Sequence, residues 1–132
     1  MAKKVTDEEL IALAAEARKR AYAPYSHFAV GAALLAKSGK VYTACNVENV
    51  SYGLSVCAER AAVFKAVSEG EREFEAIAVV TENGIPPCGA CRQVLREFGE
   101  DMRVIVADEE GAYQVFSLRD LLSHPIAPGE VE

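Results

Sequence analysis

The chain has 132 residues, 51% of them hydrophobic and 26% charged, and a formal net charge of -6. This length predicts a single domain over residues 1–132, with a core that needs no disulfides. The acidic balance argues against a nucleic-acid partner, which requires clustered Lys and Arg. No apolar run is long enough to cross a membrane, and no signal peptide follows the basic start, so we expect a cytoplasmic protein.

Hydrophobic periodicity and turn residues predict four helices and five strands. In chain order, we expect a helix over 7–22, strands over 28–36 and 41–48, a helix over 57–69, a strand over 77–80, a helix over 89–98, strands over 104–107 and 113–116, and a helix over 118–122. Thr6 and Glu9 form a capping-box pattern at the first helix, and Pro24 stops it. This alternation predicts an α/β fold in three layers, with a mixed sheet of about five strands and helices on both faces.

Two cysteine clusters lie where expected helices begin. Cys57 precedes one helix, and Cys88 and Cys91 open another. The partial positive charge at a helix N-terminus lowers the pKa of a thiol and stabilises the thiolate that zinc needs. Three cysteines without an evident fourth ligand fit a catalytic zinc, which keeps one coordination position open, better than a structural zinc, which has four protein ligands.

Other interpretations of the cysteines explain less of the sequence. A redox pair at Cys88 and Cys91 would leave Cys57 without a role, and a structural zinc site would need Cys45 as its fourth ligand. In a strand over 41–48, Cys45 would face away from the side that carries Asn46 and Glu48. We therefore expect Cys45 to be a small buried residue.

Two charged residues follow Cys57 directly. Glu59 could simply complement the helix dipole, but beside a metal-activated water it suits a general acid and base. Three thiolates and Zn²⁺ sum to a charge of −1, and Arg60, one helical turn after Cys57, could offset that charge by a hydrogen bond to sulfur. The alternative is that Arg60 is an ordinary exposed helix residue.

Four stretches of the chain resemble the cytidine deaminases, specifically the small homotetrameric type with three cysteine ligands. They are residues 25–33 (YSHFAVGAA), 46–49 (NVEN), 57–60 (CAER) and 87–93 (PCGACRQ). The resemblance implies zinc-dependent hydrolytic deamination of cytidine and deoxycytidine to uridine, deoxyuridine and ammonia, within pyrimidine salvage. It also implies that Cys57, Cys88 and Cys91 hold one Zn²⁺ per subunit, that Glu59 shuttles protons, and that Arg60 pairs with the thiolates.

The resemblance assigns substrate contacts as well, to Phe28, Asn46, Glu48, Tyr52 and the backbone N–H of Ala58. Asn46 and Glu48 would bind the ribose hydroxyls, Phe28 would pack against the pyrimidine, and Ala58 would bind the base carbonyl. Tyr52 would reach a sugar held by a neighbouring subunit. The implied partners are therefore the nucleoside and other copies of the chain, with no nucleic acid polymer and no membrane.

The C-terminal stretch departs from the family. Members of the family usually carry Leu-Leu-Pro-x-x-Phe there, and the Phe covers a neighbour's substrate. This chain has Leu-Leu-Ser-His-Pro-Ile-Ala-Pro over residues 121–128, so Ile126 or Pro128 occupies the aromatic position, and His124 is a candidate substitute. Alternatives to a cytidine deaminase are an aminohydrolase for a modified nucleoside such as blasticidin S, a polynucleotide-editing deaminase, and a zinc-binding module without activity.

Overall fold

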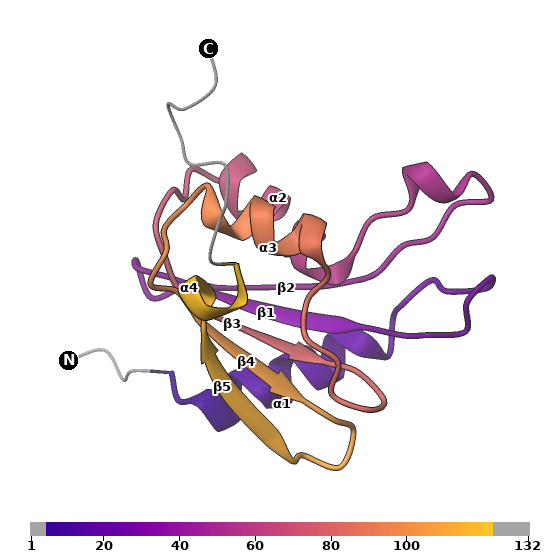
Figure 1. Ribbon diagram of the computed structural model, residues 1–132, viewed down its shortest axis with the longest axis horizontal. Helices are drawn as coiled ribbons and strands as arrows, with labels where there is room; N and C mark the ends of the chain where they lie inside the picture. Colours follow the sequence, from indigo (N-terminus) through magenta and orange to yellow (C-terminus); the bar gives the residue numbers. More distant parts are fainter. Residues whose placement is uncertain (1–4, 123–132) are drawn as a thin grey trace.

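The computed structural model describes residues 5–122, which form the four expected helices, the five expected strands and one short 3-10 helix (Figure 1). In chain order these are α1 (Asp7–Arg18), β1 (Gly31–Ala36), β2 (Val41–Cys45), η1 (Tyr52–Leu54), α2 (Ala58–Ser68), β3 (Phe74–Val80), α3 (Gly89–Arg96), β4 (Arg103–Ala107), β5 (Tyr113–Ser117) and α4 (Leu118–Leu121). No helix within residues 5–122 has the length and hydropathy to span a membrane.

The strands form one mixed sheet in the order β2-β1-β3-β4-β5. Only β3 and β4 run parallel, and the other neighbouring pairs are antiparallel. Helix α1 packs on one face, while α2, α3 and α4 cover the other (Figure 1). Alternate residues of β1 pack into opposite layers of the core, with Leu34 on the α2 side and Leu35 on the α1 side. The predicted three-layer α/β fold is therefore confirmed.

Helix α1 lies unusually close to the start of β1. A Cβ atom added to Gly31 would lie 2.0 Å from the carbonyl oxygen of Ala14 and 2.6 Å from the backbone nitrogen of Arg18. Both atoms belong to the backbone, so neither can move aside cheaply. Glycine at this position lets α1 seat against the segment that precedes β1, where the Arg18 Nε–H donates to the carbonyl of Ala29 at 2.9 Å.

Two expected boundaries are wrong because the chain pairs with itself outside the sheet. Helix α1 ends at Arg18 rather than at residue 22, and β2 ends at Cys45 rather than at residue 48. The Tyr22 N–H donates to the Asn46 carbonyl at 3.0 Å, and the Glu48 N–H donates to the Tyr22 carbonyl at 2.8 Å. Because residues 22 and 46–48 pair with each other, they do not continue α1 and β2.

Smaller differences occur at other ends. Strand β1 begins at residue 31 rather than 28, and β3 begins at residue 74 rather than 77, because residues 74–76 pair with the end of β1. Helix α3 ends at residue 96 rather than 98. The stretch after residue 122, with His124, Ile126, Pro128 and the tail expected to be loose, lies outside the described residues.

Candidate active site

The two cysteine clusters meet at the starts of two helices. Cys57 is the N-cap residue of α2, Cys88 is the N-cap residue of α3, and Cys91 lies in the first turn of α3. The sulfurs of Cys57 and Cys88 are 3.9 Å apart, and those of Cys88 and Cys91 are 3.3 Å apart. The expected convergence of both clusters is present.

This sulfur set fits a zinc ion. All three Sγ atoms lie within 4.8 Å of one another. Tetrahedral coordination with Zn–S bonds of about 2.3 Å places sulfurs roughly 3.8 Å apart, which is close to the observed spacing. Among residues 5–122, Cys45 does not belong to this cluster, and neither does any other His, Cys, Asp or Glu. The described residues therefore supply three ligands and leave one coordination position for a water or a substrate.

Hydrogen bonds within the cluster favour the thiolate form of Cys57. Hydrogen bonds with Cys91 and with the Arg60 guanidinium lower the pKa of Cys57 to about 5. Burial acts in the opposite direction and raises this pKa. The pKa of Cys91 is raised by its hydrogen bond with Cys57 and by burial. The Arg60 Nη2 donates to the Cys57 sulfur at 3.5 Å, whereas its buried Nε–H has no partner among the described residues. Arg60 is thus placed to offset thiolate charge.

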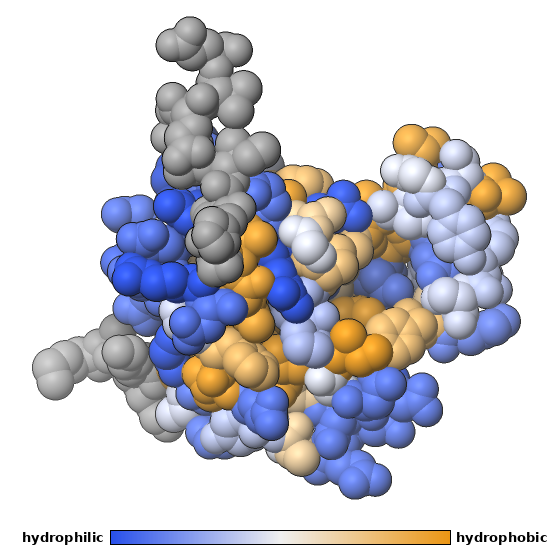
Figure 2. All heavy atoms as spheres, in the orientation of Figure 1, coloured by the Kyte–Doolittle hydropathy of each residue, from blue (hydrophilic) through white to orange (hydrophobic). Residues whose placement is uncertain are grey.

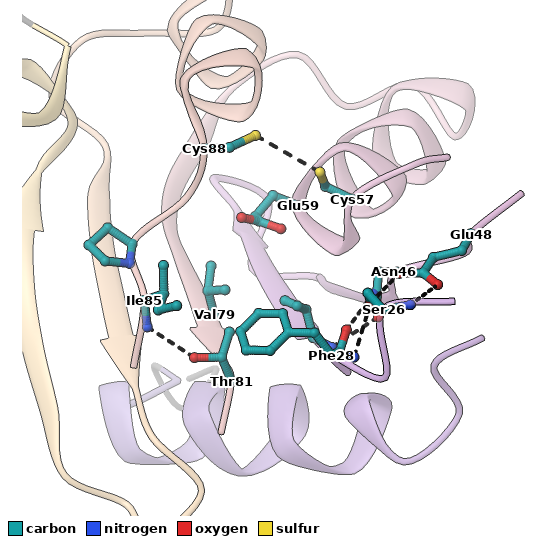
Figure 3. A pocket seen from close by; sticks show the side chains of 12 residues that line it. Ser26, Phe28, Asn46, Glu48, Cys57, Glu59, Val79, Thr81, Ile85 and Cys88 are labelled. Atoms are coloured by element: carbon teal, nitrogen blue, oxygen red, sulfur yellow. Dashed lines mark hydrogen bonds between the residues drawn. The ribbon is translucent and has the colours of Figure 1, made fainter. Parts of the chain in front are cut away.

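Glu59 is a buried carboxyl group beside the sulfurs. It is the second residue of α2 and is 5% exposed. Burial raises its pKa to about 7, and the charge of Cys57 adds to this shift. In Figure 3 its carboxylate lies between the sulfurs and the ring of Phe28. A carboxyl with a pKa near neutrality, held beside a metal position, can both accept and donate a proton.

A cleft of about 270 Å³ joins this corner to the residues expected to bind substrate. Its lining includes Phe28, Asn46, Glu48, Cys57, Glu59 and Cys88 (Figure 3). The sulfurs and Glu59 lie at one end, and Asn46 and Glu48 lie at the other. The structure therefore brings the expected metal, proton-transfer and sugar-binding residues around a single cavity.

The polar residues at the far end of the cleft are already engaged with the protein. The Glu48 Oε1 accepts the N–H groups of Tyr25 at 3.0 Å and Ser26 at 3.1 Å, and its Oε2 accepts the Ser26 hydroxyl. The Ser26 hydrogen bonds, together with the positive charge of His27, lower the pKa of Glu48, although desolvation opposes this shift. Glu48 is therefore an ionised hydrogen-bond acceptor at this end of the cleft.

Two of the expected substrate residues do not line the cleft among the described residues. Ala58 is fully buried as the first residue of α2, where a backbone N–H has no partner within its own helix. Tyr52 is 72% exposed in η1, at the tip of a segment that projects from the body (Figure 1). The expected contact of Tyr52 with a sugar would therefore need a second subunit.

Several cleft residues had no role in the sequence interpretation. Ser26 has a recognisable local signal, because a serine two residues before Phe28 suits a turn in which its hydroxyl accepts the Phe28 N–H, here at 3.0 Å. Thr81, just after β3, accepts the Ile85 N–H at 3.0 Å and lines the cleft beside the Phe28 ring (Figure 3). Whether Thr81 lines the cleft depends on the path of the 82–87 loop after β3, and no local sequence pattern indicates that path.

Comparison with known proteins agrees with this geometry. A family model described as the cytidine and deoxycytidylate deaminase zinc-binding region matches residues 4–108. The chain belongs to this deaminase family. The cytidine deaminase of Sporosarcina psychrophila is 51% identical over 118 residues, covering 87% of each chain.

A crystal structure of the family extends the likeness to three dimensions. The cytidine deaminase from Burkholderia pseudomallei superposes with a TM-score of 0.89 at 51% identity, covering 92% of this chain and 99% of the other. A more distant relative is the blasticidin-S deaminase of Bacillus cereus, which is 31% identical over 110 residues, covering 76% of this chain and 78% of its own. The family and the sulfur cluster together support one Zn²⁺ at this deaminase site.

Proposed function

We propose that this protein is a zinc-dependent hydrolase that converts cytidine and deoxycytidine to uridine, deoxyuridine and ammonia. The observation that carries the proposal is the shared cleft, which is lined by Cys57, Cys88 and the buried Glu59 at one end and by Asn46 and Glu48 at the other. Cys91 completes the sulfur cluster behind this lining. Relatives about half identical to this chain are named cytidine deaminases. We further propose a cytoplasmic role in pyrimidine salvage.

The cysteines and Arg60 prepare the metal corner. Cys57, Cys88 and Cys91 hold Zn²⁺, which when bound supplies Lewis-acid activation of water. Three thiolates leave the site with a charge of −1, and a more negative site resists ionisation of water. The Arg60 guanidinium, 3.5 Å from the Cys57 sulfur, offsets part of that charge.

Glu59 moves the protons. The reaction transfers both hydrogens of water: one ends on N3 of the ring, and the other ends on the amino nitrogen, which leaves C4 as ammonia. Glu59 accepts each proton from the attacking water and delivers it, a relay for which a pKa near the working pH is best. Its burial keeps bulk water from competing for these transfers.

The remaining cleft residues orient the nucleoside. Glu48 accepts hydrogen bonds from sugar hydroxyls, and the Asn46 amide contributes a second polar contact. Phe28 packs against the ring, and the Ala58 N–H binds the base carbonyl from the helix N-terminus. Because the sugar contacts add binding energy remote from C4, cytosine without a sugar should react poorly.

We propose that the protein acts as a homotetramer. The projecting segment 47–56 exposes apolar side chains that a monomer would leave in water, among them Val50 at 78%, Tyr52 at 72% and Leu54 at 68%. Figure 2 shows apolar surface at the tip of this segment, at the upper right. A neighbouring subunit would cover these groups and would bring Tyr52 to the sugar in another site.

The direct test is ammonia release from cytidine, deoxycytidine and blasticidin S, with zinc measured in the same sample. We expect one Zn²⁺ per chain and turnover of both cytosine nucleosides. Preferential turnover of blasticidin S would favour the modified-nucleoside alternative suggested by the 31% identical relative. Stoichiometric zinc without deamination of any nucleoside would make the protein a zinc-binding module.

A further inference from the structure

We infer that Ser26 is a positioning residue that couples sugar recognition to the placement of Phe28 against the pyrimidine ring. The inference rests on the proposed function, because it takes the Phe28 ring as one wall of the nucleoside site. Its basis is a hydrogen-bond network in which the residues proposed to bind the sugar also hold the backbone of Phe28 (Figure 3).

A single hydroxyl links the sugar end of the cleft to Phe28. The Ser26 Oγ–H donates to the Glu48 Oε2, and the same oxygen accepts the Phe28 N–H at 3.0 Å. Donation to a carboxylate polarises the hydroxyl and gives its oxygen more negative charge, so the bond from the Phe28 N–H is strengthened. A shift of the Glu48 carboxylate would therefore also shift the Phe28 backbone, because the Ser26 Oγ is bonded to both.

The other side of Phe28 is held by the second sugar residue. Asn46 is 8% exposed, and its Nδ2 donates to the Phe28 carbonyl at 2.8 Å while its Oδ1 accepts the Val30 N–H at 2.9 Å. Both backbone polar groups of Phe28 are therefore bonded through this network. An amide has two hydrogens and two lone pairs, so one of each is left for a substrate hydroxyl.

The backbone between these anchors needs such support. His27 has φ at 59°, a left-handed conformation that is uncommon for residues other than glycine and persists where surrounding contacts enforce it. The Glu48 carboxylate supplies those contacts by accepting the N–H groups of Tyr25 and Ser26. Loss of the Ser26 hydroxyl removes the link between this turn and the ring that follows it.

The alternative is that Asn46 and Glu48 act on the sugar alone and that Ser26 is an ordinary turn residue. The two possibilities differ for a substrate without a sugar. If the network positions Phe28, disrupting it weakens reaction of the bare ring as much as reaction of the nucleoside. If the network serves only the sugar, the variant deaminates a substrate without a sugar as efficiently as wild type does.

The experiment uses the zinc-loaded full chain and two substrates, cytidine and 1-methylcytosine, in which a methyl group replaces the sugar. For Ser26→Ala we expect kcat/KM to fall by roughly 10- to 100-fold for both, the loss expected for one hydrogen bond to a charged group. Ser26→Thr keeps the hydroxyl and should restore at least half of the activity. Zinc content should stay at the wild-type value, and thermal unfolding should stay cooperative.

The matched control is Ser38→Ala. Ser38 makes the same two kinds of bond in the β1–β2 turn, donating to Glu71 at 2.7 Å and accepting the Lys40 N–H at 3.4 Å. That turn lies at the opposite end of β1 from the cleft-lining Val30. Removing this hydroxyl should leave both kcat/KM values within twofold of wild type.

A second readout does not depend on activity. Amide hydrogen exchange at Phe28 should be at least fivefold faster in Ser26→Ala, with exchange in β3 unchanged. The inference is overturned if Phe28 exchange is unaltered, if 1-methylcytosine turnover stays within twofold of wild type, or if Ser26→Ala shows no cooperative unfolding. If the wild type deaminates no nucleoside, the proposed function fails, and the exchange result alone then decides whether Ser26 positions Phe28.

Discussion

At the scale of single residues, Glu59 combines two properties that oppose each other in most folded proteins, burial and a titratable charge. Its burial raises the pKa to about 7, so the folded protein holds this proton more tightly than an unfolded chain would. Such a carboxyl is costly for stability but useful for proton transfer. This conflict is the physical reason to expect a functional role at this position.

Replacing Glu59 by Gln should separate proton transfer from the rest of the site. The amide keeps the shape of the side chain but cannot accept the proton of water, so we expect kcat to fall by about 10³-fold or more. Zinc content should remain one per chain, because the sulfur ligands are untouched. Ammonia release in stopped assays and metal analysis measure both quantities, and turnover near the wild-type rate would refute the proton relay.

The site residues differ in how visible they are in the sequence. The three cysteines and Glu59 could be proposed from local chemistry, since each lies at a helix start whose partial charge suits it. The position of Ser26 could not be interpreted in the same way. Its partner Glu48 is 22 residues away, and their contact depends on the pairing of Tyr22 with the segment after β2.

At the scale of elements, the cluster connects helices α2 and α3 through their first residues. A metal at this position would hold two elements that otherwise meet only along a small contact. Metal binding and folding are coupled in such an arrangement, because the ligands are close together only in the folded state. The stability of this half of the protein should therefore depend on metal supply.

Cys88→Ala tests this coupling. With one ligand lost from α3, we expect zinc to fall well below one per chain and the thermal midpoint to drop by several degrees. Added zinc should raise the midpoint of metal-depleted wild type but not that of the variant. Cys45→Ala is the control, since Cys45 lies outside the cluster. Full zinc occupancy in Cys88→Ala would remove this residue from the ligand set.

The β1–β2 hairpin offers a test by pH. Tyr42 in β2 is 4% exposed, and burial, with a hydrogen bond from its hydroxyl to Glu71 at 2.9 Å, raises its pKa to about 12. An unfolded tyrosine loses its proton near pH 10, so the folded state binds more protons between pH 10 and 12. Stability from this group is complete below pH 10 and is lost as pH rises toward 12.

We therefore expect wild type to lose stability relative to Tyr42→Phe between pH 10 and 12. Urea unfolding at pH 8, 10, 11 and 12 measures the difference between the two proteins. Tyr22→Phe removes the hydroxyl of an exposed tyrosine and serves as the control. A constant difference between wild type and Tyr42→Phe across this range would contradict the assignment.

The helices and strands differ in how far local sequence determines them. Their types and order could be predicted, because capping residues, glycines and periodic apolar runs act locally. Their boundaries could not be predicted where long-range pairing decides, as at the end of α1, where Tyr22 bonds to Asn46 and Glu48. The same pairing delivers Asn46 and Glu48 to the cleft, so the least predictable boundary is also a functional one.

At the scale of the whole molecule, the projecting segment is the feature that a lone chain explains least well. Apolar side chains on its tip extend away from both layers of the core (Figure 2). Hydrogen bonds between Val47 and Val56 close this loop, but its own packing leaves the apolar side chains exposed, and contact with another surface would bury them. The proposed tetramer supplies that contact and gives Tyr52 a site to reach.

Leu54→Lys should weaken assembly without harming the fold. Leu54 is exposed, so the change should alter the stability of a single chain by less than about 0.5 kcal/mol. Light scattering after size exclusion should show wild type at four times the 14.2 kDa chain mass and the variant at a lower mass with reduced turnover. Leu13→Lys, at an exposed position of α1, is the control. A monomeric wild type would refute the tetramer.

Cysteine at the N-cap of two helices has a consequence beyond catalysis. Ser, Thr, Asp or Asn normally closes a helix start, and replacing such a cap typically costs about 1 kcal/mol. In α2 and α3, within the described chain, the Cys57 and Cys88 side chains form no capping hydrogen bond. Zinc binding at these two cysteines would hold both helix starts in place of the missing caps. We therefore expect metal-depleted protein to be cleaved faster than zinc-loaded protein in limited proteolysis, with the first cuts near these helix starts.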